Sequence, residues 1–142
     1  MIDSVEISNF RGFKSLRLRE LKRFNILVGP NGTGKTALLE AVFVASANSA
    51  EVSLRLRSWR GLGDRIEVTQ DKRSLRALWQ DLFFSEEEPS FSIVVSDSRG
   101  RARSCRAYYE SADSIVLPPG PQTIDSAVLV PVVFEWSFNG QV

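Results

Sequence analysis

Apolar and polar side chains alternate in two parts of the chain. Residues 2–19 contain two alternating stretches around a break at Asn9–Gly12, which predicts a β-hairpin. Residues 91–95 and 102–109 alternate in the same way around a polar turn that contains Gly100, which predicts a second pair of strands.

A different pattern lies between these two regions. Residues Phe24–Val28 are nearly continuous in apolar character, which predicts a central strand buried on both faces. From Lys35 the apolar residues recur at helical spacing, which predicts a helix to about Ala47. The spacing over residues 71–84 predicts a second amphipathic helix, whereas Glu51–Trp59 is compatible with either a strand or a helix.

The last thirty residues favour a loop followed by a strand. Residues 111–122 are rich in Ser and Pro, and residues 127–138 are typical of a strand in which Pro131 indicates an edge position or a bulge. Asn139–Gly140 is a strong hairpin-turn signal, but only two residues follow it. We therefore expect the 142 residues to be one N-terminal lobe, 1–142, of a longer protein.

The composition excludes several classes of protein and several kinds of site. The chain is 43% hydrophobic with a formal net charge of +1, which argues against intrinsic disorder. It has no histidine and one cysteine, Cys105, which excludes an internal disulfide framework, a His-ligated zinc site and a Ser/His or Cys/His catalytic pair. No signal peptide and no apolar run of about 18 residues is present, so we expect a cytoplasmic protein without a membrane partner.

Residues 29–36, Gly-Pro-Asn-Gly-Thr-Gly-Lys-Thr, satisfy the phosphate-loop pattern G-x-x-x-x-G-K-[ST] between a predicted strand and a predicted helix. Glycines let the main chain turn tightly and bring successive amides to phosphate oxygens. We predict an anion cradle formed by the amides of Gly32, Thr33, Gly34, Lys35 and Thr36 at the positive end of the helix. Lys35 is the predicted catalytic contact to the β- and γ-phosphates of ATP, and the Thr36 hydroxyl the predicted Mg²⁺ ligand.

Three segments together resemble a known group. Val-Glu-Ile-Ser-Asn-Phe-Arg-Gly-Phe-Lys at 5–14, the apolar run and phosphate loop at 24–36, and Leu-Leu-Glu-Ala at 38–41 are similar to the start of ABC-type ATPase heads. Within these, the pattern resembles the structural-maintenance-of-chromosomes (SMC), RecF and OLD (overcoming lysogenisation defect) ATPases. The resemblance covers residues 1–45 and is generic beyond them.

The resemblance implies an α/β fold, the first lobe of a P-loop NTPase head. We expect a mixed sheet whose buried strand ends in the phosphate loop, one long helix behind it, and an antiparallel β-layer. In this family two heads sandwich two ATP molecules and the closed dimer acts on DNA, in repair or, with a nuclease domain or subunit, in defence against foreign DNA. Matched residue by residue, Asn31 lies on the γ-phosphate side, and Arg11 and Lys14 lie near the nucleotide.

Other parts of the family pattern are missing from these residues. There is no Leu-Ser-Gly-Gly-type signature, no histidine switch, and no run of four apolar residues followed by Asp-Glu. Phosphoryl transfer needs a metal held from two sides and a positioned nucleophile. We therefore expect ATP binding here, with hydrolysis dependent on further segments of a complete protein or on a partner head.

Arginine supplies most of the positive charge and gathers in clusters. In an extended strand Arg99, Arg101 and Arg103 would share one face, in a row able to meet DNA phosphates. The overall charge is close to neutral, however, and charged rows on hairpins are usually just solvated.

Two other functions remain open. One is a small P-loop phosphotransferase or GTPase, although a guanine-reading Asn-Lys-x-Asp is absent. The other is a non-catalytic, nucleotide-gated assembly module.

Overall fold

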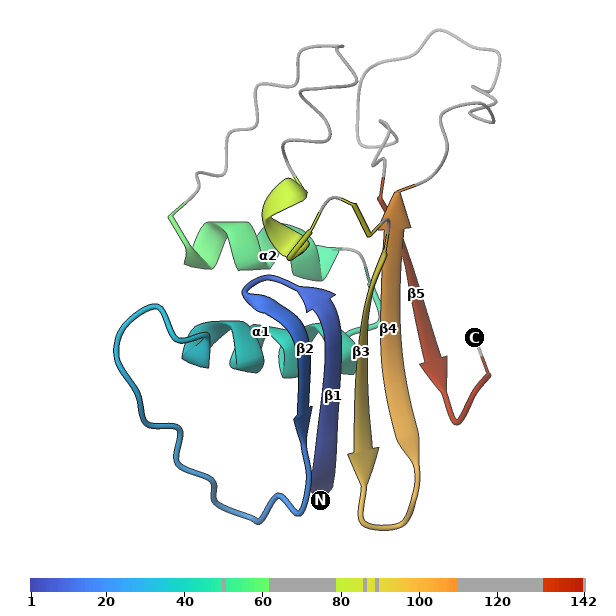
Figure 1. Cartoon of the computed structure of the whole chain (residues 1–142). Helices are drawn as coiled ribbons and strands as arrows, with labels where there is room; N and C mark the ends of the chain where they lie inside the picture. The colour runs from blue at the N-terminus through green and yellow to red at the C-terminus, as the bar shows by residue number, and fades with distance from the viewer. Residues whose placement is uncertain (50, 62–78, 86, 89, 110–131, 142) are drawn as a thin grey trace, which may run out of the picture.

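An antiparallel five-stranded sheet forms the centre of the molecule (Figure 1). The computed structural model describes residues 1–49, 51–61, 79–85, 87–88, 90–109 and 132–141. The strands are β1 (Ile2–Phe10), β2 (Phe13–Leu18), β3 (Ser90–Asp97), β4 (Ala102–Tyr109) and β5 (Val132–Phe138). They lie in the order β2-β1-β3-β4-β5, and each neighbouring pair is antiparallel.

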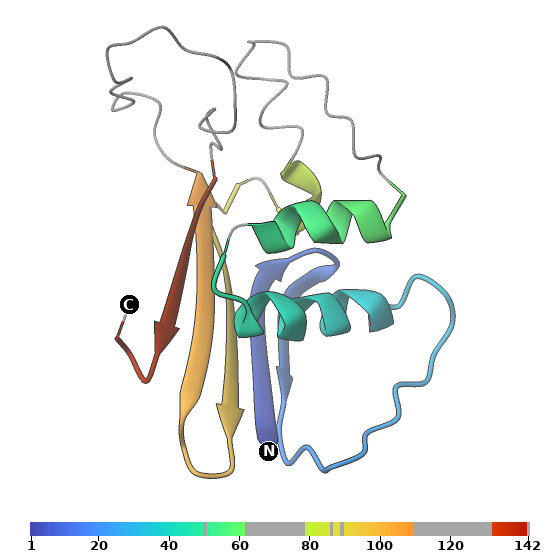
Figure 2. The same ribbon diagram turned by 180° about the vertical axis from the view of Figure 1, so that it is seen from behind.

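Helices cover one face of this sheet. The helix α1 (Lys35–Ser46) packs on β1, β3 and β4, and α2 (Glu51–Trp59) packs on α1 (Figure 2). A short 3₁₀ helix, η1 (Gln80–Leu82), precedes β3. The ring of Phe13, the first residue of β2, lies at Gly34, so the hairpin tip lies at the start of α1.

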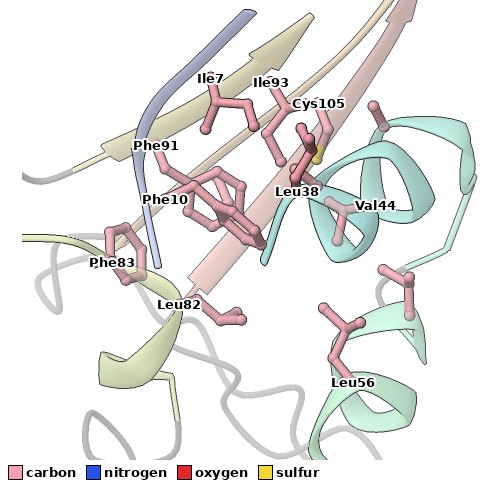
Figure 3. Packing of buried hydrophobic residues seen from close by; sticks show 14 of the residues in the cluster. Ile7, Phe10, Leu38, Val44, Leu56, Leu82, Phe83, Phe91, Ile93 and Cys105 are labelled. Atoms are coloured by element: carbon pink, nitrogen blue, oxygen red, sulfur yellow. The ribbon is translucent and has the colours of Figure 1, made fainter. Parts of the chain in front are cut away.

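The core lies between the sheet and the helices (Figure 3). Alternate residues of β3 and β4, such as Phe91, Ile93 and Cys105, point toward α1 and are at most 1% exposed. Phe10 packs edge-on against Phe91 with ring centroids 5.0 Å apart. Burial raises the pKa of the Cys105 thiol to about 12.

A buried amide fastens the end of β1 to the segment before β3. The Asn9 side chain is fully buried, and its Nδ2 lies 3.2 Å from the carbonyl oxygen of Ser85 and 3.0 Å from those of Glu88 and Ser90. Its Oδ1 accepts from the Ser85 amide at 2.8 Å. Because buried polar groups are costly unless they are paired, these bonds fix the two segments to each other.

Most predicted elements are confirmed. Both strand pairs form, and the helix after the phosphate loop runs to Ser46. Glu51–Trp59, which the sequence left open between a strand and a helix, is a helix. Asn139 and Gly140 have φ of 52° and 80° and form the predicted two-residue turn, with Phe138 and Gln141 exchanging backbone hydrogen bonds.

The predicted mixed sheet with a buried strand at Phe24–Val28 is wrong. The segment is not a strand, and Phe24, Ile26 and Val28 are 84%, 88% and 89% exposed. A parallel strand needs neighbours that exchange backbone hydrogen bonds with it, and none of the described strands pairs with these residues. The apolar run therefore has no described partner.

Some predictions fall outside the described residues. The loop at 111–122, Pro131 and most of the helix predicted at 71–84 belong to this group. At the described end of that helix, Gln80–Leu82 is a 3₁₀ turn rather than a continuous α-helix. The described part of the last predicted strand is β5.

Candidate functional site

The phosphate loop leads directly into α1. Gly32 and Gly34 have φ of +82° and +89°, a left-handed conformation that glycine adopts without strain. Within the described residues, no hydrogen-bond acceptor faces the amides of Gly32 to Thr36, and the first turn of α1 carries no acidic residue. Unpaired amides at the positive end of a helix are an anion-binding arrangement.

The β1–β2 hairpin contacts this loop through Phe13. A Cβ on Gly34 would lie 2.6 Å from Phe13 Cζ, too close for any real contact. The ring thus lies where a side chain at position 34 would have to go. The absence of a side chain at Gly34 therefore permits both the loop turn and the close approach of the hairpin.

The Lys35 ammonium folds back on the loop. Its Nζ donates to the carbonyl oxygens of Gly29 at 2.7 Å and Pro30 at 2.5 Å. The Thr33 hydroxyl donates to the same Pro30 carbonyl at 3.0 Å. These bonds hold the loop in a compact turn and keep the Lys35 ammonium beside the free amides.

A pocket of about 470 Å³ opens at this point. Its lining includes the loop and helix residues Asn31, Gly32, Gly34, Lys35 and Thr36, together with Arg11 from the hairpin. Thus six of the eight predicted nucleotide-binding residues surround one cavity. The other two, Thr33 and Lys14, are not among its lining residues, and Lys14 is exposed on β2.

Four charged side chains form a chain of ion pairs, in which Arg11, Arg60 and Asp81 line the pocket and Glu40 is buried behind them. Arg11 contacts two carboxylates: its Nε lies 3.2 Å from Glu40 Oε2, and its Nη1 pairs with Asp81 Oδ2. Arg60 Nε and Nη2 donate to the two Glu40 oxygens at 2.8 and 2.7 Å. The bonds to Glu40 raise the pKa of Arg60 above its ordinary value, so the guanidinium remains charged.

The sequence analysis missed Glu40, Arg60 and Asp81 as site residues. Glu40 carried a usable signal, because it occupies the buried face of α1 beside Leu38 and Ala41, and a carboxylate there requires a partner. No local pattern identified the partner, since Arg60 is twenty residues further along the chain.

The donors around the pocket suit a nucleoside triphosphate. Free amides, the Lys35 ammonium and two guanidiniums are donors for phosphate oxygens, and the Thr36 hydroxyl is an oxygen ligand of the kind that Mg²⁺ accepts. Arg11 Nη2 is buried without a hydrogen-bond partner among the described residues, which leaves a charged donor to satisfy.

Residues 1–113 match the model of the AAA ATPase domain. The chain belongs to this family. Among curated proteins it is 47% identical over 132 residues to the DNA double-strand break repair Rad50 ATPase of Methanopyrus kandleri, an alignment that covers 91% of this chain and 14% of that protein. It is 32% identical over 92 residues to the chromosome partition protein Smc of Methanocaldococcus jannaschii, covering 65% of this chain and 8% of Smc.

A third relative is the DNA replication and repair protein RecF of Idiomarina loihiensis. The chain is 42% identical to it over 43 residues, 30% of this chain and 12% of RecF. The chain therefore spans less than a sixth of each of these three relatives. The resemblance to the N-terminal part of an SMC/RecF-like ATPase head is confirmed, and the domain contains the whole phosphate loop.

The three arginines predicted to form one row in a strand do not do so. Arg99 lies in the turn before β4, and only Arg103 is within the strand. Arg101 donates through Nε and Nη2 to Asp97 Oδ2 at 2.9 and 2.7 Å, and Arg103 Nη1 donates to the Ser46 carbonyl at 3.1 Å. The row fails because a tight turn takes up the first two residues.

Asp97 organises that turn. Its Oδ1 accepts from the amides of Arg99 at 2.9 Å and Arg101 at 3.0 Å. Hydrogen bonds from the Arg101 side chain lower the Asp97 pKa to about 2, from an ordinary value of 3.8.

No helix in the described part of the chain is long and apolar enough to span a membrane.

Proposed function

We propose that this domain is the ATP·Mg²⁺-binding part of an SMC/RecF-like ATPase that acts on DNA. The observation that carries the proposal is the set of unpaired amides from Gly32 to Thr36 at the head of α1, beside a pocket that also contains Lys35 and Arg11. A triphosphate tail is the ligand whose charge and oxygen atoms match such a set of donors.

Each loop residue has a distinct role in the proposal. The amides of Gly32, Thr33 and Gly34 bind phosphate oxygens, while Lys35 exchanges its two loop carbonyls for the β- and γ-phosphates. Asn31 lies on the γ-phosphate side, and the Thr36 hydroxyl ligates Mg²⁺. The metal, when bound, neutralises charge on the phosphates.

Arg11 lines the pocket, and its guanidinium contributes positive charge beside the nucleotide. Lys14, which is exposed on β2, contributes charge near the nucleotide at longer range.

Hydrolysis and DNA contact require the complete protein. The names of the relatives describe a DNA repair ATPase, a chromosome partition protein and a replication and repair protein, which favours a role in DNA repair. We infer that a second head, or the remainder of the same polypeptide, completes the ATPase site. A DNA substrate and a nuclease subunit are the further partners of this proposal.

The test is nucleotide binding by a charge variant. Lys35→Ala should weaken binding of a fluorescent ATP analogue by about 10- to 150-fold, the effect of losing a charge-assisted hydrogen bond. The matched control is Lys22→Ala, which removes the same charge from an exposed residue outside the pocket. Equal affinities for the two variants would refute the role of Lys35, and no binding by the unmodified chain would refute the proposed function.

A further inference from the structure

Arg60 is held at the pocket wall from two directions. Its backbone follows α2, where the Arg60 amide donates to the Arg57 carbonyl at 3.0 Å and the Gly61 amide to the Ser58 carbonyl at 2.9 Å. Gly61 has φ of +69°, the left-handed residue that ends many helices. The side chain then reaches Glu40 on α1.

The geometry of the Glu40 contact leaves one side of the guanidinium available. Nε and Nη2 face the two carboxylate oxygens in a bidentate pair, and Nη1 has no partner among the described residues. A guanidinium is planar and carries five N–H donors, so the edge between Nη1 and Nη2 retains donors for a second anion. The Arg60 side chain is 37% exposed and lines the pocket.

Electrostatics favour an anion in front of that edge. Lys35, Arg11 and Arg60 are three cations on the pocket, against the carboxylates of Glu40 and Asp81. Glu40 is 3% exposed and contacts both guanidiniums, so its charge is already shared. A buried ion pair gives little net stability, because desolvation offsets the attraction. This arrangement is therefore better suited to orienting the two guanidiniums than to stabilising the fold.

We propose that Arg60 is an additional phosphate-binding residue of this pocket and that Glu40 is the positioning residue that directs its guanidinium toward the ligand. The proposal rests on the proposed ATP site and adds a residue to it. In this proposal Arg60 binds the terminal phosphates, so it contributes to affinity for ATP, which carries them, and not to affinity for AMP, which lacks them. If the Glu40–Arg60 pair served only to stabilise the fold, replacing Arg60 would change the affinities for ATP and AMP to the same extent.

The experiment measures ATP and AMP binding by calorimetry in the full chain. Arg60→Gln should weaken ATP binding about tenfold or more and change AMP binding at most about twofold. Arg60→Lys retains the charge but not the bidentate geometry, so its ATP affinity should lie between those of the unmodified chain and Arg60→Gln. The matched control is Arg55→Gln, an exposed arginine of α2 that lies five residues before Arg60 and outside the pocket. Circular dichroism at the binding temperature confirms that each variant is folded.

A double-mutant cycle tests the role of Glu40. Because Glu40 also contacts Arg11, the cycle is measured in an Arg11→Gln background. If Glu40 acts through Arg60, Glu40→Gln should weaken ATP binding in that background, and adding Arg60→Gln to it should weaken binding no further than Arg60→Gln does without it. Additive losses would overturn the positioning role. ATP affinity of Arg60→Gln equal to that of Arg55→Gln, while Lys35→Ala still loses binding, would overturn the role of Arg60 and leave the proposed function intact. Failure of the unmodified chain to bind ATP would overturn both.

Discussion

Replacing Gly34 by alanine tests the contact between the hairpin and the phosphate loop. Two costs are expected at this position. The first is backbone strain, because φ is +89°. A side chain in the left-handed region costs about 1–2 kcal/mol, partly offset by about 0.4–1 kcal/mol from the reduced entropy of the unfolded chain.

The second cost is steric. The new Cβ would meet Phe13 Cζ at 2.6 Å and Cε1 at 3.0 Å, so the ring must move. Forcing extra volume into a packed contact costs about 1–3 kcal/mol. We therefore expect Gly34→Ala to lower the free energy of unfolding by about 1–5 kcal/mol in total, and to weaken ATP binding because the loop is displaced.

Gly32→Ala is the matched control. Its φ is +82°, close to that of Gly34, but a Cβ at Gly32 meets no atom within 4 Å. The Gly32→Ala variant should therefore lose stability only through backbone strain. Urea unfolding of both variants, with and without Phe13→Ala, isolates the steric part, since removing the ring should bring Gly34→Ala to the level of Gly32→Ala. Equal destabilisation by the two glycine variants with Phe13 in place would refute the reasoning.

Three further predictions concern the sheet. The lowered Asp97 pKa stabilises the folded state above about pH 3.8, and this contribution is lost as the pH falls toward 2. The difference in the free energy of unfolding between the unmodified chain and Asp97→Asn, measured in urea, should therefore shrink over that range. A constant difference would contradict the assignment. The Cys105 thiol, with a pKa of about 12, should resist alkylation by iodoacetamide at pH 8 until urea unfolds the chain, and rapid labelling of the native chain would show that the residue is accessible. Because Arg101 pairs with Asp97 and Arg103 with the Ser46 carbonyl, replacing Arg99, Arg101 and Arg103 by serine should leave the salt dependence of DNA binding by the complete protein unchanged, and a shallower slope would show that these side chains contact phosphates.

Local patterns were sufficient for much of the fold. Alternation over β3 and β4 predicts both strands, because each buries every second residue against α1. The phosphate loop and the start of α1 follow from a motif whose glycines and lysine are adjacent in sequence. For the same reason, most of the predicted pocket residues lie together in the structure.

Features that depend on distant partners were not predictable. The apolar run at Phe24–Val28 indicates burial, but a sequence pattern does not supply the neighbouring strand that would cover it. Val52 and Leu56 are spaced to suit either a strand or a helix, and both are buried on one side of α2. The Glu40–Arg60 pair joins α1 to the turn that follows α2, and neither residue type identifies the other.

The buried amide of Asn9 has a mechanical consequence. Asn9 ties the end of β1 to Ser85, and two residues after it Arg11 joins both Asp81 and Glu40. The Arg11 amide also donates to the Leu82 carbonyl at 2.9 Å. A displacement of residues 81–85 would therefore pull on the hairpin tip and on the wall of the phosphate pocket together. Through this linkage, force applied to the segment before β3 would be transmitted to the proposed triphosphate site, and ligand binding there would stiffen that segment in return.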